Sequence, residues 1–160
     1  MDNEARDVML LSIHPIHAAD ILDGSKTVEL RRTRPSIEPG QLVLLYASSP
    51  VCAVVGACRL RGFEIDSTAA IKSKHLRNAA ISGTDYDNYF RGASRATALL
   101  LDRATAMQRP VSLNRLRESS ATMPVQSWRF VSSQALDPLL ADVDRASLSL
   151  LADVDGPIAH

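Results

Sequence analysis

The sequence lacks several features that mark common classes of protein. Only two cysteines occur among its 160 residues, Cys52 and Cys58, and neither has the second pair or the histidine that a zinc site needs. No apolar run approaches the roughly 20 residues of a membrane-spanning helix, and residues 1–7 have no apolar signal-like core. We therefore expect a cytoplasmic protein with free thiols, without membrane association, bound metal or cofactor.

Net charge is also absent, but the charges are unevenly distributed. Residues 1–133 hold 17 Lys and Arg against 13 Asp and Glu, whereas residues 134–160 hold one Arg against five Asp. Fifteen of the 18 basic residues are arginines, which suit forked contacts with phosphate. This distribution favours an anionic ligand for the main body of the chain.

What the sequence does contain is typical of one globular domain of the α+β class. Apolar residues make up 46% of the chain. Gly56, in the middle of an apolar strand, predicts a bulge or bend that helps to close a small barrel of about six strands. Helices are expected between the strands, at residues 14–23 and twice within residues 66–92, and a short helical turn follows a break at residues 109–110. The expected strands are residues 8–13, 27–31, 41–47, 51–60, 96–101 and 124–130.

Residues 24–34, GSKTVELRRTR, are the strongest candidate for a functional site. Val28 and Leu30 alternate with Glu29 and Arg31, which predicts a half-buried strand with one apolar and one polar face. Lys26 stands at the start of this strand, so we expect its amine at the rim of the site. A carboxylate among cations stays ionised, and the surplus cations attract an anion. The cations of this segment are Lys26, Arg31, Arg32 and Arg34.

Two interpretations of this segment remain open: an anion-binding site, or a solvated edge strand held by salt bridges. The same choice applies to the aromatic residues Tyr86, Tyr89 and Phe90, whose helical spacing is more typical of a core than of a platform for stacking bases. An exposed tyrosine among them would favour the platform. His14 and His17 are interpreted as polar surface residues, and the less favoured alternative is that one of them lines the ligand groove.

The end of the chain differs in character from the rest. Residues 134–156 are acidic, begin a helix at Asp137-Pro138 and repeat the hexapeptide LLADVD at an offset of eleven residues, which places both copies on one face. The predicted amphipathic helix needs a partner for its apolar face. The partner is either the body of the protein or the same helix of a second chain, which would make a homodimer.

Several segments in the same order resemble the ASCH domain, a member of the PUA-like superfamily. The resemblance spans residues 8–131 and leaves the acidic helix outside. Its main signature is a strand and a short helix followed by Gly-x-Lys-x-x-Glu-x-Arg. The matching segments are LSIHPIHAADILDGSKTVELRR at 11–32, YASSP at 46–50, VVG at 54–56, YFRG at 89–92, RPVSL at 109–113 and PVQSWRF at 124–130.

The resemblance implies a β-barrel with a cleft for RNA, a nucleotide or a nucleoside. The residues that it assigns to binding are Lys26, Glu29, Arg31, Arg32, Ser48, Ser49 and Gln126. Lys26 and Glu29 are also its candidates for acid–base catalysis.

Activity varies within this family. Many members are regarded as nucleic-acid binders, some as nucleases, and one branch deacylates modified cytidine with a lysine, a threonine and a glutamate. Lys26 matches that lysine, whereas Glu29 replaces the threonine and residues 78–80 hold no carboxylate. An RNA-binding protein is the leading hypothesis, with a ribonuclease or a nucleoside amidohydrolase as the alternative.

Overall fold

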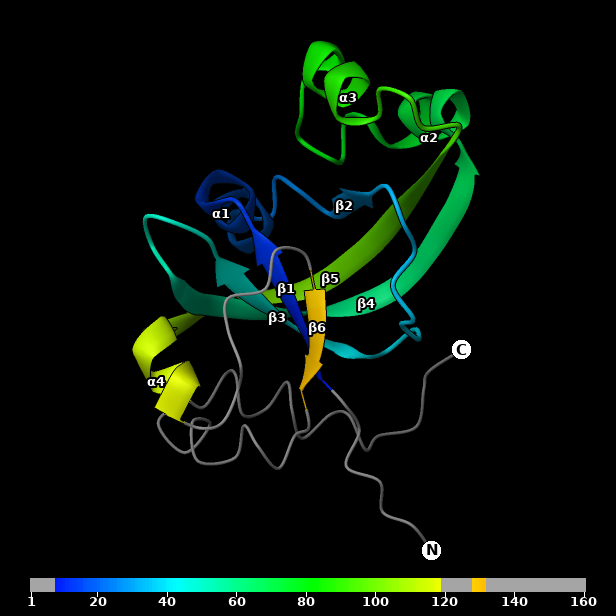
Figure 1. Cartoon of the computed structure of the whole chain (residues 1–160). Helices are drawn as coiled ribbons and strands as arrows, with labels where there is room; N and C mark the ends of the chain where they lie inside the picture. The colour runs from blue at the N-terminus through cyan, green and yellow to red at the C-terminus, as the bar shows by residue number, and fades with distance from the viewer. Residues whose placement is uncertain (1–7, 119–127, 132–160) are drawn as a thin grey trace, which may run out of the picture.

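The computed structural model describes residues 8–118 and 128–131, which form one curved sheet with helices attached (Figure 1). The sheet has six strands in the order β2-β5-β4-β3-β1-β6, and only β1 and β3 are parallel neighbours. The strands are β1 (Val8–Ile13), β2 (Val28–Arg31), β3 (Leu42–Ala47), β4 (Ala53–Ser67), β5 (Arg95–Ser112) and β6 (Trp128–Val131), and the helices are α1 (Pro15–Asp23), α2 (Thr68–His75), α3 (Gly83–Tyr89) and α4 (Leu113–Glu118).

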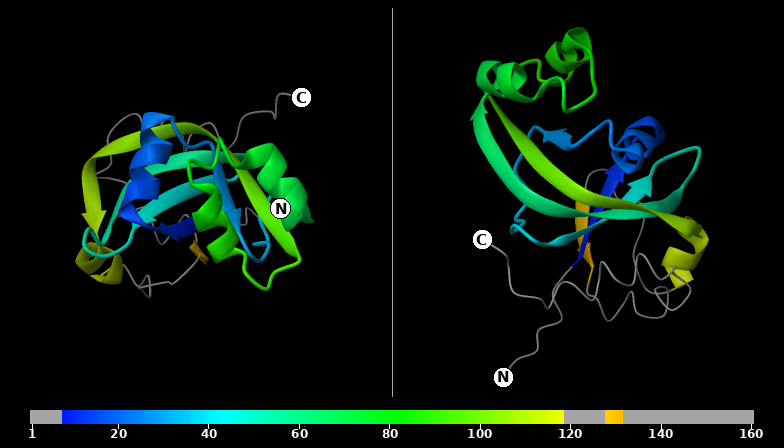
Figure 2. Two further views of the ribbon diagram at one scale, coloured as in Figure 1. Left: turned by 90° about the horizontal axis from the view of Figure 1, so that it is seen from above. Right: turned by 180° about the vertical axis from the view of Figure 1, so that it is seen from behind.

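The α+β class is therefore confirmed, but the expectation of a closed barrel is wrong. Within the described residues β2 pairs only with β5 and β6 pairs only with β1, so the sheet keeps two free edges. Closure would need hydrogen bonds between edge strands, and β2 has only four residues to offer. The sheet instead bends strongly along β4 and β5 (Figures 1 and 2).

Strands β4 and β5 are much longer than expected from sequence, with 15 and 18 residues. The break expected at Arg109-Pro110 falls inside β5. The ladder pairs Gly56 with Ala106 but Val54 with Val111, so residues 107–110 lie in an irregular stretch where register is lost. A proline there removes no regular ladder hydrogen bond, and β5 continues past it.

The core occupies both faces of the central strands β1 and β3. Leu10 and Leu44 belong to one buried cluster and Leu11 and Leu45 to another on the opposite face. This arrangement explains why both strands are continuous apolar runs rather than alternating ones. Cys58 is buried in the second cluster, where burial raises the pKa of its thiol to about 12.

Helix α1 packs closely on the sheet at Gly56. A Cβ atom at residue 56 would lie 2.5 Å from Cδ2 of Leu22 in α1 and 2.7 Å from the carbonyl oxygen of Thr105 in β5. Only glycine allows this approach, and the predicted irregularity is confirmed by a register shift at this point of the β3–β4 ladder. The predicted helix end is also confirmed, because Gly24 adopts a left-handed φ of 88°.

Helices α2 and α3 cover the outer end of the sheet. Ile71, Tyr86 and Phe90 pack there with Val28 and Leu30 of β2 in a third buried cluster. Both helices lie on the same side of the sheet as α1 (Figures 1 and 2). The two helices predicted within residues 66–92 are thus confirmed, and β2 lies in the region between them and α1.

Candidate functional site

The turn after α1 directs Lys26 into the protein. The Asp23 carboxylate accepts hydrogen bonds from the backbone N–H and the hydroxyl of Ser25, at 2.8 and 2.5 Å, and the N–H of Lys26 donates to the carbonyl of Asp20 at 2.9 Å. Lys26 is only 3% exposed, and its amine donates to the carbonyl oxygen of Ala79 at 2.5 Å. The expectation that Lys26 lies at a rim is therefore wrong.

Three charged side chains meet inside the fold at this point. The Lys26 amine lies 3.4 Å from Oε2 of Glu29, and the Arg31 guanidinium lies 3.0 Å from Oε1. Arg31 also donates to the backbone carbonyl of Ser12 in β1 at 3.1 Å. We call Lys26, Glu29 and Arg31 the buried charge cluster. The predicted two faces of β2 are confirmed, because Val28 packs in the apolar cluster under α2 and α3. The expectation of a half-buried strand is wrong, because all four residues of β2 are buried.

Burial controls the electrostatics of this cluster. It lowers the pKa of Lys26, and the neighbouring Glu29 offsets part of that effect. Within the cluster one carboxylate faces two cations, and the Asp20 carboxylate of α1 also interacts electrostatically with Lys26. Charges in a region of low dielectric have a longer reach than the same charges in water.

Two further side chains belong to the site, His17 of α1 and Tyr89 of α3. Both interact electrostatically with Glu29, so the two helices face the same carboxylate. Burial and the nearby Lys26 lower the pKa of His17, whose Nδ1 is buried without a hydrogen-bond partner among the described residues. The interpretation of His17 as a surface residue is wrong. Its position one turn before the buried Ile21 is the sequence signal that places it toward β2.

The aromatic residues of α3 divide into two kinds. Tyr86 and Phe90 are buried, as the core interpretation requires, whereas Tyr89 is 42% exposed. The exposed tyrosine that would favour a stacking platform is therefore present. Its ring packs edge-on against Phe90, with centroids 4.7 Å apart.

The remaining arginines of the segment have different surroundings. Arg32 is exposed and donates to the backbone carbonyls of Tyr89 and Arg91, at 2.9 and 3.2 Å. It thereby fixes the end of α3 next to the site. Arg34 instead lies over the ring of Phe63 in β4, 4.2 Å from its centroid. Arg34 thus contacts a different part of the sheet.

The structure does not bring all of the predicted residues together. Ser49 lies in the β3–β4 turn, whereas the N–H of Ser48 donates to the carbonyl of Ile13 at 2.9 Å, one residue from the Ser12 carbonyl that accepts from Arg31. Gln126 and the predicted helix at residues 134–156 are outside the described residues. The loop at residues 78–80 contributes main-chain carbonyls, to Lys26 and to the start of β2. No side-chain carboxylate is available from it.

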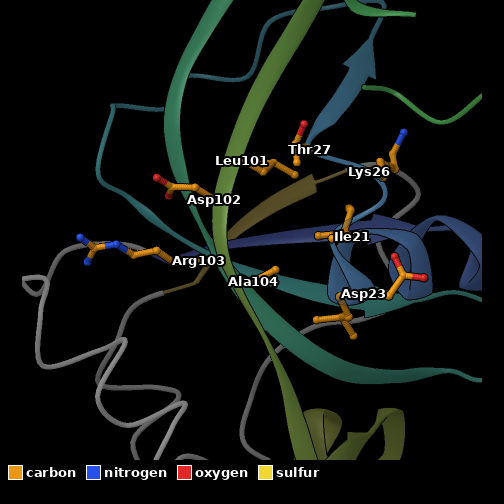
Figure 3. A pocket seen from close by; sticks show the side chains of 10 residues that line it. Ile21, Asp23, Lys26, Thr27, Leu101, Asp102, Arg103 and Ala104 are labelled. Carbon is orange, nitrogen blue, oxygen red and sulfur yellow. The ribbon is translucent and has the colours of Figure 1, made fainter. Parts of the chain in front are cut away.

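An open cavity of about 340 Å³ lies between α1 and β5, next to this site. Ile21, Leu101 and Ala104 form part of its wall (Figure 3). The Lys26 amine points away from it, and the Arg103 side chain extends away from α1 (Figure 3). Lys26 lines the cavity, whereas Glu29 and Arg31 do not.

Two features of other kinds of site are absent from the part of the chain that the structure describes. It contains no group of three or more His, Cys, Asp and Glu side chains able to hold a metal ion. None of its helices combines the length and apolar character needed to cross a membrane.

Fold and site together define a small α+β protein with a charged cluster beside an arginine-rich strand, and sequence comparison agrees. The family model of the ASCH domain matches residues 11–103. A protein of Zymomonas mobilis named "ASCH domain-containing ribonuclease" is 32% identical over 137 residues, which are 85% of this chain and 92% of that protein. The chain belongs to the ASCH domain family.

Solved structures and a further relative extend this comparison. The crystal structure of ASCH from Zymomonas mobilis superposes with a TM-score of 0.81 at 30% identity, over 85% of this chain and 95% of that one. A Ureaplasma parvum protein named "Large ribosomal subunit protein uL22" is 31% identical over 114 residues, which are 71% of this chain but 36% of that protein. The similarity thus extends well beyond the basic segment.

Proposed function

We propose that this protein binds RNA at the surface above the buried charge cluster. The cluster itself is the main support. Burying three charges costs several kcal/mol per ion before their attraction is counted, so such clusters are poor devices for stability alone. Buried charge clusters are common at functional sites, where their electrostatic field acts on a ligand or substrate. Two buried cations beneath the exposed Arg32 can attract a phosphate.

The contacts to RNA come from the exposed members of the site. The buried residues are Lys26, Glu29 and Arg31, with 3%, 7% and 9% of their surface exposed. They therefore set the electrostatic potential of the site and the positions of their neighbours, and do not contact the ligand themselves. Arg32 is exposed and held by two carbonyls at the end of α3. It is the side chain best placed to contact a phosphate directly.

Binding is tested by the salt dependence of affinity for a fluorescent 12-nucleotide RNA, measured by anisotropy. Each phosphate contact contributes about −0.7 to −0.9 to the slope of log affinity against log salt. Arg32→Ala should weaken binding and reduce this slope by about one contact. Arg61→Ala, which removes an exposed arginine of β4 instead, is the matched control and should change neither. Equal slopes for wild type and Arg32→Ala would show that Arg32 does not contact a phosphate. Absence of RNA binding by the wild type would refute the proposal.

A second function, cleavage of the bound RNA, is favoured by His17. A histidine with a lowered pKa is neutral near pH 7 and can accept a proton. The relative from Zymomonas mobilis carries the name ribonuclease. In the reaction the 2′-oxygen loses its proton to His17 and attacks phosphorus. The bond to the 5′-oxygen breaks, that oxygen takes a proton from water, and the cations offset the charge of the phosphorane.

Cleavage makes a specific prediction about products. This route yields a 2′,3′-cyclic phosphate and a free 5′-hydroxyl, which mass spectrometry distinguishes from hydrolysis products. His17→Gln should lower the cleavage rate by about 10²-fold or more and leave RNA affinity nearly unchanged. RNA whose 2′-hydroxyls are methylated is the substrate control and should bind without being cleaved. A linear 3′-phosphate formed without a cyclic intermediate, or full activity of His17→Gln, would contradict this mechanism.

A further inference from the structure

The exposed face of Tyr89 is a feature that the buried charge cluster does not explain. Apart from this residue, the large apolar side chains exposed in the described ranges are Ile16 and Val51. Both are aliphatic. Tyr89 is therefore the aromatic residue among them, and the guanidinium of Arg32 is hydrogen-bonded to its backbone. An aromatic face next to a phosphate-binding cation is the combination that a single nucleotide requires.

The ring of Tyr89 is held in place before any ligand arrives. Phe90 packs against it at an interplanar angle of 77°, which fixes the tilt of the ring. The backbone carbonyl of Tyr89 accepts a hydrogen bond from Arg32 at 2.9 Å. An aromatic side chain fixed in this way loses little conformational entropy when a base stacks on it.

The two ends of the Tyr89 side chain lie in different surroundings. Burial raises the pKa of its phenol, whose electrostatic neighbours include Arg31 and Glu29. The hydroxyl end lies next to the backbone of Arg32, and 42% of the residue remains exposed to solvent. A base on the exposed ring would place its own sugar and phosphate near Arg32, which is bound to the same residue.

We propose that Tyr89 and Arg32 form a subsite for one unpaired nucleotide, in which the base stacks on the Tyr89 ring and the phosphate contacts the Arg32 guanidinium. This inference rests on the proposed RNA-binding function and gives it a substrate class, single-stranded RNA. A base within a duplex is already stacked on both faces, so it cannot cover the ring without being unpaired.

The test compares a 12-nucleotide single-stranded RNA with a duplex of the same sequence. Tyr89→Leu removes the aromatic face and keeps an apolar side chain against Phe90. Its affinity for the single strand should fall between about 5-fold and 150-fold, the range for loss of one base–aromatic stack. Its affinity for the duplex should stay within a factor of two. Tyr89→Phe and Tyr89→Trp should retain single-strand affinity, a rescue by aromatic character that a merely structural role would not produce.

A second measurement separates failure of this subsite from failure of the proposed function. Protein with ¹³C-labelled tyrosine is titrated with AMP and followed by NMR. Stacking should shift the ring signals of Tyr89, while the buried Tyr46 and Tyr86 serve as internal references.

Unchanged single-strand affinity of Tyr89→Leu, or an equal loss for the duplex, would overturn the subsite and leave RNA binding intact. A wild-type protein that binds neither RNA would overturn the proposed function. In that case the AMP titration decides the subsite alone: shifted Tyr89 signals support it, and unshifted signals overturn it.

Discussion

Two clusters in this protein each hold one carboxylate between two basic side chains, in opposite surroundings. In the buried charge cluster Glu29 lies between two cations, at 3.4 and 3.0 Å. On the outer surface Glu64 of β4 also lies between two basic side chains of α2, with Lys74 and His75 both at 2.7 Å. The surface contacts are the shorter ones. The side chain of Lys74 is nevertheless 61% exposed, whereas that of Lys26 is 2% exposed.

The comparison shows that distance alone does not measure what an ion pair contributes. Water and salt screen the surface cluster, so its short contacts are worth little. The buried cluster has lost its water, and each member depends on the others for compensation. Removing one charge should therefore be tolerated at Glu64 and severe at Glu29.

The largest effect is expected for Glu29→Gln. This change keeps the side-chain shape but leaves Lys26 and Arg31 buried as two like charges, and it should lower the free energy of unfolding by about 3–5 kcal/mol. Urea unfolding followed by circular dichroism measures the change. A midpoint equal to that of the wild type would show that water reaches the cluster and that the contrast between the two clusters is wrong.

The next effect concerns Lys26 and alkaline pH. Its pKa is lowered by burial, so as pH rises the folded protein releases this proton before the unfolded chain does. Between the folded pKa and the unfolded value near 10.5, stability of the wild type should therefore rise relative to Lys26→Met. The slope is at most about 1.4 kcal/mol per pH unit. Parallel stability curves between pH 8 and 10.5 would contradict a desolvated amine.

A smaller effect with the same sign is expected at acidic pH from His17. Its pKa is lowered by burial and by Lys26, so the unfolded chain binds a proton first as pH falls below about 6.5. Wild-type stability should decline from pH 6.5 downward relative to His17→Gln, and the two should run in parallel above pH 7.5. Thermal unfolding at half-unit pH steps would reveal this, and a constant difference across the range would argue against a partly buried imidazole.

The smallest effect is expected for Glu64→Gln, the surface counterpart of the first variant. Its unfolding midpoint should be close to that of the wild type in dilute buffer and indistinguishable from it in 1 M NaCl, where the Debye length is about 3 Å. The Glu29→Gln deficit should persist in the same salt. If both variants respond equally to salt, burial does not separate the two clusters.

The sequence allowed good prediction of features that depend on neighbouring residues. The alternation in β2, the proline start of α1 and its glycine end all follow from local rules. The burial of Lys26 did not follow, because its carbonyl partner Ala79 is 53 residues away in the chain. The predictions of sheet closure and of the length of β5 were wrong for a similar reason. Both features depend on which strands pair and in which register.

The site was predicted in part for the same physical reasons. Glu29 and Arg31 were identified because both lie on one face of a single strand. His17 and Tyr89 were not assigned to it, because two different helices bring them to that strand. The cytoplasmic location, the 8–131 boundary, the role of Gln126 and dimerisation through residues 134–156 all stay predictions.

The Arg31 guanidinium has a consequence for how this protein can change during evolution. It joins Glu29 of β2 to the carbonyl of Ser12 in β1, two strands that are not neighbours in the sheet. Substitutions in the buried charge cluster will therefore reduce the amount of folded protein in a cell before any loss of activity can be measured. A mutational screen scored by growth will confuse the two effects there. Selection for a new ligand is freer to act on His17, Arg32 and Tyr89, where recognition can vary while the fold persists.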